Sequence, residues 1–152
     1  MVGPEKESKG NRGKRFHVKR VLSLLGDPPT AEFYWDFEEI DISMEPTSMI
    51  LARVLIGRVK DLTRFRLVLW RTPLQQEVKA WNWVDWIEEA FHGAIQDSEA
   101  LETYITDWAV IKETAMRYVE LKRLARRFDG TRAYDFTKVP TWDMLRGAET
   151  IP

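Results

Sequence analysis

Three tryptophans crowd the start of a predicted helix in the segment KAWNWVDWIEEAF. Trp81, Trp83 and Trp86 surround Asn82, which forms a capping pattern with Asp85 three residues later. The first turn of a helix carries partial positive charge, so it favours anions and can acidify a nucleophile. Because Trp83 directly follows the cap, we expect its indole to line a substrate pocket at this helix start, with Asn82 as a further binding residue.

A second group of aromatic residues lies on a predicted strand, AEFYWDFEEIDI. Alternation along this strand places Phe33, Trp35 and Phe37 on one face and Tyr, Asp and Glu on the other. If the aromatic face meets Trp83 over the helix start, the two form an apolar cleft that binds a hydrophobic molecule. The sequence therefore predicts an aromatic substrate-binding site.

His17 and Lys19 are the candidate polar groups of this cleft. In RFHVKRVLSLL, His17 alternates with Phe16 and Val18, so it lies on the opposite face of that strand from both. An imidazole exchanges protons near neutral pH, which makes His17 the candidate catalytic residue. Lys19 is a candidate substrate-binding residue beside it. The alternative is a structural or surface role for His17.

Composition and charge exclude several classes of function. Because 23 basic and 24 acidic side chains nearly cancel, the chain has no long-range field to gather nucleic acid or an anionic membrane. It contains no cysteine, which excludes disulfides, thiolate metal sites and a cysteine nucleophile. The sequence has no metal-spaced histidine cluster, glycine-rich phosphate loop or Ser-His-Asp arrangement, so we expect no metal and no cofactor.

The sequence also lacks signals for a membrane or for secretion. No apolar run reaches the roughly 20 residues that a membrane helix needs. The N-terminus MVGPEKESKGNRGKR lacks the apolar core of a secretory signal. These features predict a cytoplasmic protein with no membrane partner, and they leave its oligomeric state open.

The chain divides into a short polar segment and one domain. Residues 1–15 are rich in Gly, Lys, Glu and Ser, which predicts a flexible N-terminal segment. Residues 16–152 are long enough for a single α+β domain with a buried core. The first two predicted strands form a hairpin around GDPPT, and the third is a buried central strand, although its periodicity also allows a helix. These strands cover residues 16–23, 31–42 and 48–58.

Helical periodicity dominates the second half of the chain. Predicted helices cover residues 61–71, 83–96 and 108–127. Asp107 caps the last of them, and Gly130 is its predicted left-handed stop. The tail TKVPTWDMLRGAETIP is predicted to form a short helical turn docked on the body. Strands first and helices after predict a mainly antiparallel sheet of about three or more strands packed against two long helices.

Several sequence blocks resemble a family of small, mostly uncharacterised fungal proteins, in the same order over nearly the whole chain: VGPEKESKGNRGKRFHVKRV, RVLIGRV, WNWVDWIEEAF, DW, RFD and VPTWD. Members of that family carry a histidine on a strand before VGP, a second histidine in the block matching FHVKR, and Asn-Cys-Val where this chain has Asn82, Trp83 and Val84.

That order of residues is similar to the circularly permuted papain-like fold of lecithin retinol acyltransferases and related thiol hydrolases. The resemblance implies a permuted papain-like fold in which Trp83 occupies the position of the nucleophilic cysteine. It also implies that His17 is the one histidine of the pair that is present. Acyl-transfer or peptidase chemistry would then be lost, and an indole would fill the former nucleophile pocket.

Three classes of function fit these observations. The preferred one is a cofactor-free enzyme of fungal secondary metabolism, a cyclase, pericyclase or isomerase that folds and orients a hydrophobic substrate. Seven Trp and seven Phe exceed what a core of this size requires, and orientation alone can contribute several kcal/mol to a unimolecular closure. The alternatives are a non-catalytic protein that binds such a molecule and an interaction module left after catalytic decay.

Overall fold

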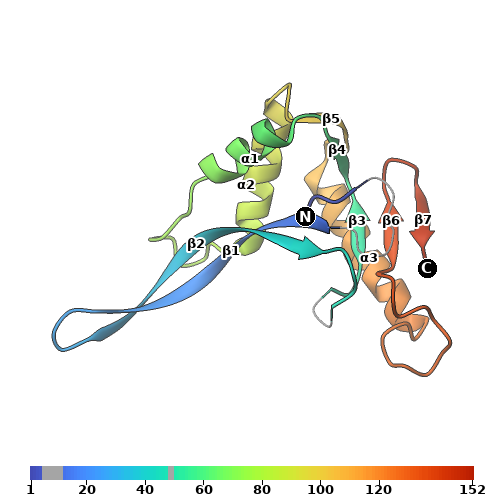
Figure 1. Cartoon of the computed structure of the whole chain (residues 1–152), viewed down its shortest axis with the longest axis horizontal. Helices are drawn as coiled ribbons and strands as arrows, with labels where there is room; N and C mark the ends of the chain where they lie inside the picture. The colour runs from blue at the N-terminus through green and yellow to red at the C-terminus, as the bar shows by residue number, and fades with distance from the viewer. Residues whose placement is uncertain (5–11, 48–49) are drawn as a thin grey trace.

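A computed structural model describes residues 1–4, 12–47 and 50–152. Within these residues the chain is an α+β protein, in which a long two-stranded ribbon projects from a body of three helices and two small sheets (Figure 1). Along the chain the elements are β1 Arg12–Leu25, β2 Thr30–Ser43, β3 Arg53–Leu55, β4 Gly57–Val59, α1 Leu62–Arg71, α2 Trp83–Gln96, β5 Leu101–Tyr104, α3 Trp108–Leu124, β6 Thr141–Asp143 and β7 Ala148–Ile151.

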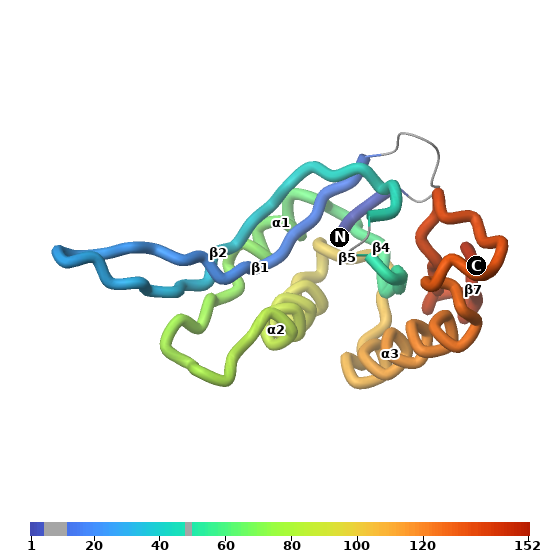
Figure 2. The backbone as a smooth tube through the Cα atoms, turned by 90° about the horizontal axis from the view of Figure 1, so that it is seen from below, coloured from blue at the N-terminus to red at the C-terminus, as the bar shows by residue number. Residues whose placement is uncertain are grey.

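The ribbon consists of β1 and β2, paired antiparallel along their whole length. Its register runs from Arg12 opposite Ser43 to Leu25 opposite Thr30. The predicted hairpin is confirmed, but both strands are longer than predicted. The ribbon extends well beyond the body, so its outer end has no helix beside it (Figures 1 and 2).

The N-terminal residues take part in this ribbon. Residues 12–15, which the sequence assigns to a flexible segment, belong to β1. The backbones of Val2 and Lys14 exchange two hydrogen bonds of 2.8 Å, so the described start of the chain is tied to β1. Residues 5–11 of the predicted segment lie outside the described residues.

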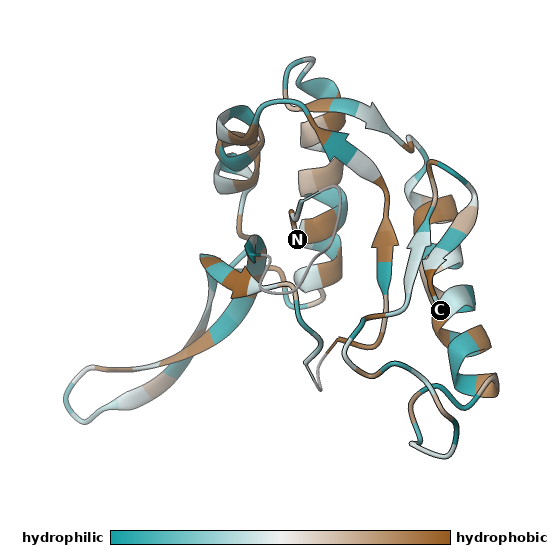
Figure 3. Ribbon diagram, turned by 45° about the vertical axis from the view of Figure 1, so that its right-hand side comes forward, coloured by the Kyte–Doolittle hydropathy of each residue, from teal (hydrophilic) through white to brown (hydrophobic). Residues whose placement is uncertain are grey.

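The base of the ribbon is held by the core of the protein. Phe16 and Val18 turn inward from β1, and Phe37 of β2 meets Trp86 of α2 with ring centroids 5.6 Å apart. Burial of large aromatic side chains dominates the energetics of such a core. Hydrophobic residues follow α2 but also continue along the projecting ribbon (Figure 3). The buried cluster consists of Phe16, Val18, Leu69, Trp81, Trp86 and Ala90.

The prediction of one central strand over 48–58 is wrong. Residues 48–49 lie outside the described residues, and the rest of the segment forms two three-residue strands, β3 and β4, in different sheets. β3 pairs parallel with β6, whereas β4 pairs antiparallel with β5. An apolar run indicates burial but does not specify a pairing partner. In the part of the chain that the structure describes, three separate sheets therefore replace the expected single sheet.

The helices begin where the sequence places their caps. Asn82 and Asp85 form the predicted capping box at the start of α2, and Asp107 caps α3. Asp61 caps α1, whose bounds agree with the prediction to one residue. The described residues thus contain three helices, of 10, 14 and 17 residues, where the sequence predicted a sheet packed against two long ones. Among the described residues, no helix is long and apolar enough to cross a membrane.

The C-terminal part of the chain differs from the prediction. α3 ends at Leu124 because Arg126, with a φ of 60°, takes the left-handed conformation before Gly130 is reached. The tail is the β6–β7 hairpin and not a helical turn, and Gly147 supplies the positive φ of its connection. A few spaced apolar residues suit either structure, which is why the tail was mispredicted.

Two tryptophans of α2 give a matched test of the core. Trp86 is 2% exposed, whereas Trp83 is 56% exposed. We predict that Trp86→Ala lowers the free energy of unfolding by about 3–5 kcal/mol because it leaves a cavity in the core. Trp83→Ala should lower it by less than about 1 kcal/mol, since the ring has less packing to lose. Urea denaturation followed by circular dichroism measures both values, and equal losses would contradict this assignment of the core.

Candidate functional site

The start of α2 presents Trp83 to the outside of the molecule. Oδ1 of Asn82 accepts a hydrogen bond of 2.8 Å from Val84 N, and its Nδ2 donates to Asp85 at 2.7 Å. Both polar ends of the Asn82 side chain are therefore engaged in the helix cap. Trp83 is more than half exposed, and the two cavities described below are lined by other residues.

The aromatic face of β2 packs against the core at one end and is exposed to solvent at the other. Trp35 lies edge-on to Trp81, with ring centroids 5.4 Å apart, and Phe37 packs against Trp86. Phe33 lies further out on the ribbon and is 59% exposed. Phe33, Trp35 and Phe37 share one face of β2 as predicted. The rings of this face contact Trp81 and Trp86, however, and not Trp83.

His17 and Lys19 lie on the other face of the ribbon from these rings, because they alternate with Phe16 and Val18. Nε2 of His17 lies 2.7 Å from one carboxylate oxygen of Glu38, and Lys19 donates to the other. The hydrogen bond from Lys19, followed by that of His17, lowers the pKa of Glu38 from 4.5 to about 2. The bond to Glu38 likewise raises the pKa of Lys19. The three side chains form an ion cluster separate from the aromatic face.

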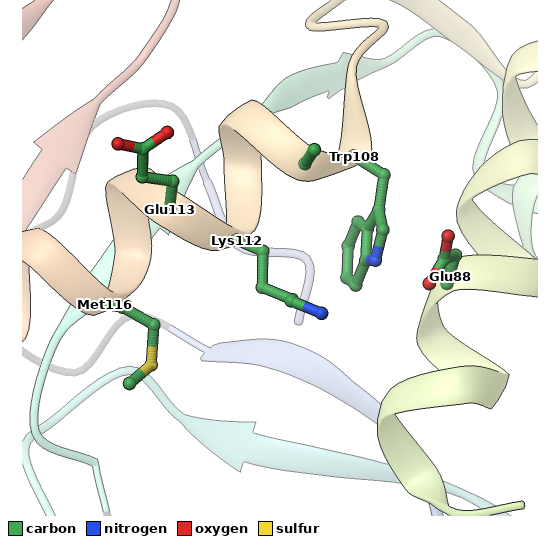
Figure 4. Close-up of a pocket in the computed structure, with 6 residues that line it drawn as sticks. Glu88, Trp108, Lys112, Glu113 and Met116 are labelled. Carbon is green, nitrogen blue, oxygen red and sulfur yellow. The ribbon is translucent and has the colours of Figure 1, made fainter.

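A groove of about 370 Å³ lies between α2 and α3 (Figure 4). Trp108, Lys112 and Met116 lie one turn apart on α3 and point to the same side, where Glu88 of α2 faces them. The indole N–H of Trp108 is buried and has no hydrogen-bond partner in the described part of the chain. An unpaired buried donor costs free energy. Its lining residues are Glu88, Trp108, Ala109, Lys112, Glu113 and Met116.

A second cavity, of about 280 Å³, lies between α3 and the β6–β7 hairpin. Its polar groups pair with one another, since Tyr118 Oη and Lys122 Nζ each lie 2.5 Å from Oε1 of Glu149. Burial, followed by the bond to Glu149, raises the pKa of Tyr118 well above its ordinary value. Burial also opposes ionisation of Glu149, but the bonds from Lys122 and Tyr118 outweigh it and lower its pKa. This mutual pairing fits a structural role, fastening β7 to α3.

The residues that the structure gathers in the α2–α3 groove were not predicted from the sequence. The available signal was the spacing of Trp108, Lys112 and Met116 at i, i+4 and i+8, which marks a row on one side of a helix. Within residues 1–4, 12–47 and 50–152, no group of three or more His, Cys, Asp or Glu side chains is placed to hold a metal ion. The groove itself combines three charged side chains, Glu88, Lys112 and Glu113, with the apolar Trp108, Ala109 and Met116.

The chain belongs to a family of unknown function, DUF6914, whose match spans residues 1–151. No curated protein and no solved structure matches it. The family description names no activity, so the function has to be argued from the geometry of the molecule.

Glu38→Gln tests whether the ion cluster stabilises the ribbon. Because folding lowers the pKa of Glu38 from 4.5 to about 2, its contribution to stability is complete above the unfolded value and is lost as the pH falls through the folded one. We predict that Glu38→Gln destabilises the protein most near neutral pH and progressively less in acid. Urea denaturation over this pH range measures the difference from the wild type, with Glu32→Gln on the same strand as the control. A loss that is independent of pH would contradict the prediction.

Proposed function

We propose that this protein is a non-catalytic interaction protein that binds its partner through the outer part of the ribbon. This part, the arm, comprises residues 20–25 of β1, residues 30–34 of β2 and the turn between them. The observation that supports the proposal most directly is the exposure of large apolar side chains on the arm, with Leu24 67% exposed. The exposed set is Leu22, Leu24, Leu25, Phe33 and Tyr34.

Both faces of the arm carry apolar side chains. The register places Leu22 opposite Phe33 on the face that continues the core, and Val21 opposite Tyr34 on the other face. A two-stranded hairpin alone is at best marginally stable in water and needs further packing. Exposed apolar surface that is contiguous marks interaction sites in many proteins. The arm thus has the composition of a covered element, while residues 1–4, 12–47 and 50–152 leave its large apolar side chains exposed.

Gln76 marks the point where the body stops covering the ribbon. Trp35 N donates to Oε1 of Gln76 at 2.7 Å, and Nε2 of Gln76 donates to Trp35 O at 2.8 Å, so a side-chain amide replaces a neighbouring strand here. Further out, the guanidinium of Arg20 lies 4.9 Å from the centre of the Phe33 ring and shields one side of it. Beyond Trp35 the ribbon is covered by its own side chains alone in the described part of the chain.

The total surface of the chain supports the same proposal. Its accessible area is 10489 Å², whereas a folded monomer of its mass exposes about 8,000 Å². Subtracting about 1,400 Å² for residues 5–11 and 48–49 still leaves an excess of roughly 1,000 Å². A standard interface buries about 800 Å² on each partner. The excess is therefore large enough for a specific interface.

The second candidate is the cofactor-free enzyme, a cyclase, pericyclase or isomerase acting on a hydrophobic substrate. The α2–α3 groove favours it, because about 370 Å³ and an unpaired indole N–H at Trp108 suit a small apolar molecule with one acceptor. Its expected catalytic residue, His17, is instead bonded to Glu38 on the face away from the aromatic rings. The interaction function requires no such residue, and we prefer it for that reason.

The proposal includes two further points: this protein descends from a permuted papain-like thiol hydrolase, and it acts in the cytoplasm. Asn82 caps α2 and Trp83 is its first residue, which supports the descent because a thiol nucleophile is acidified at a helix start. In an interaction protein the former nucleophile position is free to carry an exposed indole.

Photo-crosslinking tests the interaction function. Three variants each carry one photoreactive benzoylphenylalanine, in place of Leu24 in the arm or Met116 in the groove, or in place of Ala133 as a control. Ala133 is exposed and lies in a loop of the C-terminal region. After irradiation in the source organism, we expect position 24 to give a defined product with a protein, well above the yield at position 133. Mass spectrometry of the purified product identifies its second component.

The same experiment separates the two candidates. A small-molecule adduct at position 116, without a protein product at position 24, would favour the enzyme. A yield at position 24 no higher than at position 133 would contradict the interaction function.

A further inference from the structure

We propose that the partner of the arm is a second copy of this chain, whose α2–α3 groove receives the arm of the first while its own arm enters the groove of the first. This inference rests on the proposed interaction function and names the partner. It accounts for two uncovered surfaces, the arm and the groove, with one contact.

The groove opens from a single aromatic contact. Phe91 of α2 and Trp108 of α3 have ring centroids 5.6 Å apart, and from there the helices diverge (Figure 2). Along α2, the exposed Ile87 and Trp83 precede Phe91 by one and two turns on the same row. Along α3, Met116 follows Trp108 by two turns and is 71% exposed. Glu88 lines the groove from α2 and Trp108 and Met116 line it from α3, while Ile87 and Trp83 add exposed apolar surface on α2 beside it.

The groove and the arm each carry one basic and two acidic side chains, Lys112 with Glu88 and Glu113 in the groove and Arg20 with Asp27 and Glu32 in the arm, so pairs of opposite charge can form across the contact. Lys112 lies between Trp108 and Met116 in the row of α3 side chains that lines the groove, and it has no ion pair within the described residues. The arm brings Asp27 in its turn and Glu32 on β2, both exposed and likewise without an ion pair there. Arg20 of the arm can in turn face Glu88 on the opposite wall. Pairs of opposite charge across an interface set its register, and these pairs fix one orientation of the arm in the groove.

The arm is long enough for the groove but points away from the groove of its own chain. It leaves the body on the side opposite to α3 in both views (Figures 1 and 2). Residues 20–25 extend about 20 Å at the usual strand rise. The row from Trp83 to Phe91 spans about 12 Å of helix. An arm from another copy can therefore line the whole wall, which the chain's own arm does not reach.

Exchange of arms between two copies forms a closed assembly. Each chain gives one arm and one groove, so a two-fold axis relates the copies and no binding surface is left for a third. The surface excess of roughly 1,000 Å² per chain exceeds the share of a standard interface, about 800 Å². An unrelated partner on the arm would leave the groove open, whereas a second copy covers both.

Engineered cysteines report this contact directly, because the natural chain has none. Leu24→Cys and Met116→Cys chains are mixed and oxidised under mild conditions. We expect disulfides mainly between positions 24 and 116 of different chains. Val110→Cys is the matched control, since Val110 is also an exposed apolar residue of α3 but lies on another side of the helix. Sedimentation should show the wild type at twice 17.9 kDa and Leu24→Asp as a monomer with an unchanged circular dichroism spectrum.

Two results would overturn the inference. The first is that the wild-type protein sediments as a monomer at every concentration. The second is that a cysteine at position 24 forms a disulfide with position 110 as readily as with position 116. If the wild type is a monomer whose arm still crosslinks to another protein, the second copy is refuted and the interaction function stands. If the arm crosslinks to no protein, both are refuted.

Discussion

The packing of the ribbon base against Trp86 is the contact on which the rest of the structure depends. Trp86 is almost completely buried and meets Phe37, so α2 holds the ribbon at one end. β1 and β2 have 14 residues each, more than the body covers, and their outer part therefore projects from the molecule (Figure 1). This contact sets the direction of the arm and determines which aromatic rings are buried and which are exposed.

The pleat of the ribbon then separates two kinds of chemistry. His17 and Lys19 both bond to Glu38 on one face, and the aromatic residues of β2 lie on the other. General acid–base catalysis needs a proton-transferring group within hydrogen-bond reach of the bound substrate, and His17 lies on the other face from the aromatic rings. A docking surface needs apolar area and peripheral charges, which the arm and the groove both provide. The distribution of side chains between the two faces thus adds to the main argument for the proposed interaction function, the exposure of large apolar side chains on the arm.

Local rules predicted the parts of the fold that nearby residues determine. The caps at Asn82 and Asp107 and the alternation of β2 depend on residues within a few positions, and the structure confirms them. Pairing partners are not local, so the segment 48–58 was assigned to one sheet although its strands join two. The candidate site shows the same limit. Alternation places three rings on one face of β2, but tertiary packing puts Trp86, and not Trp83, beneath that face.

Hydrogen exchange along the ribbon tests most directly the claim that the arm is an element built to be covered by a partner. In dilute protein, the cross-strand amides of residues 20–25 and 30–34 should exchange much faster than those of residues 14–19, which lie at the packed base. They should become protected as the concentration rises and second copies bind. Arm amides that are as protected as those of the base in a dilute monomer would contradict the account, because the ribbon would then be stable without a partner.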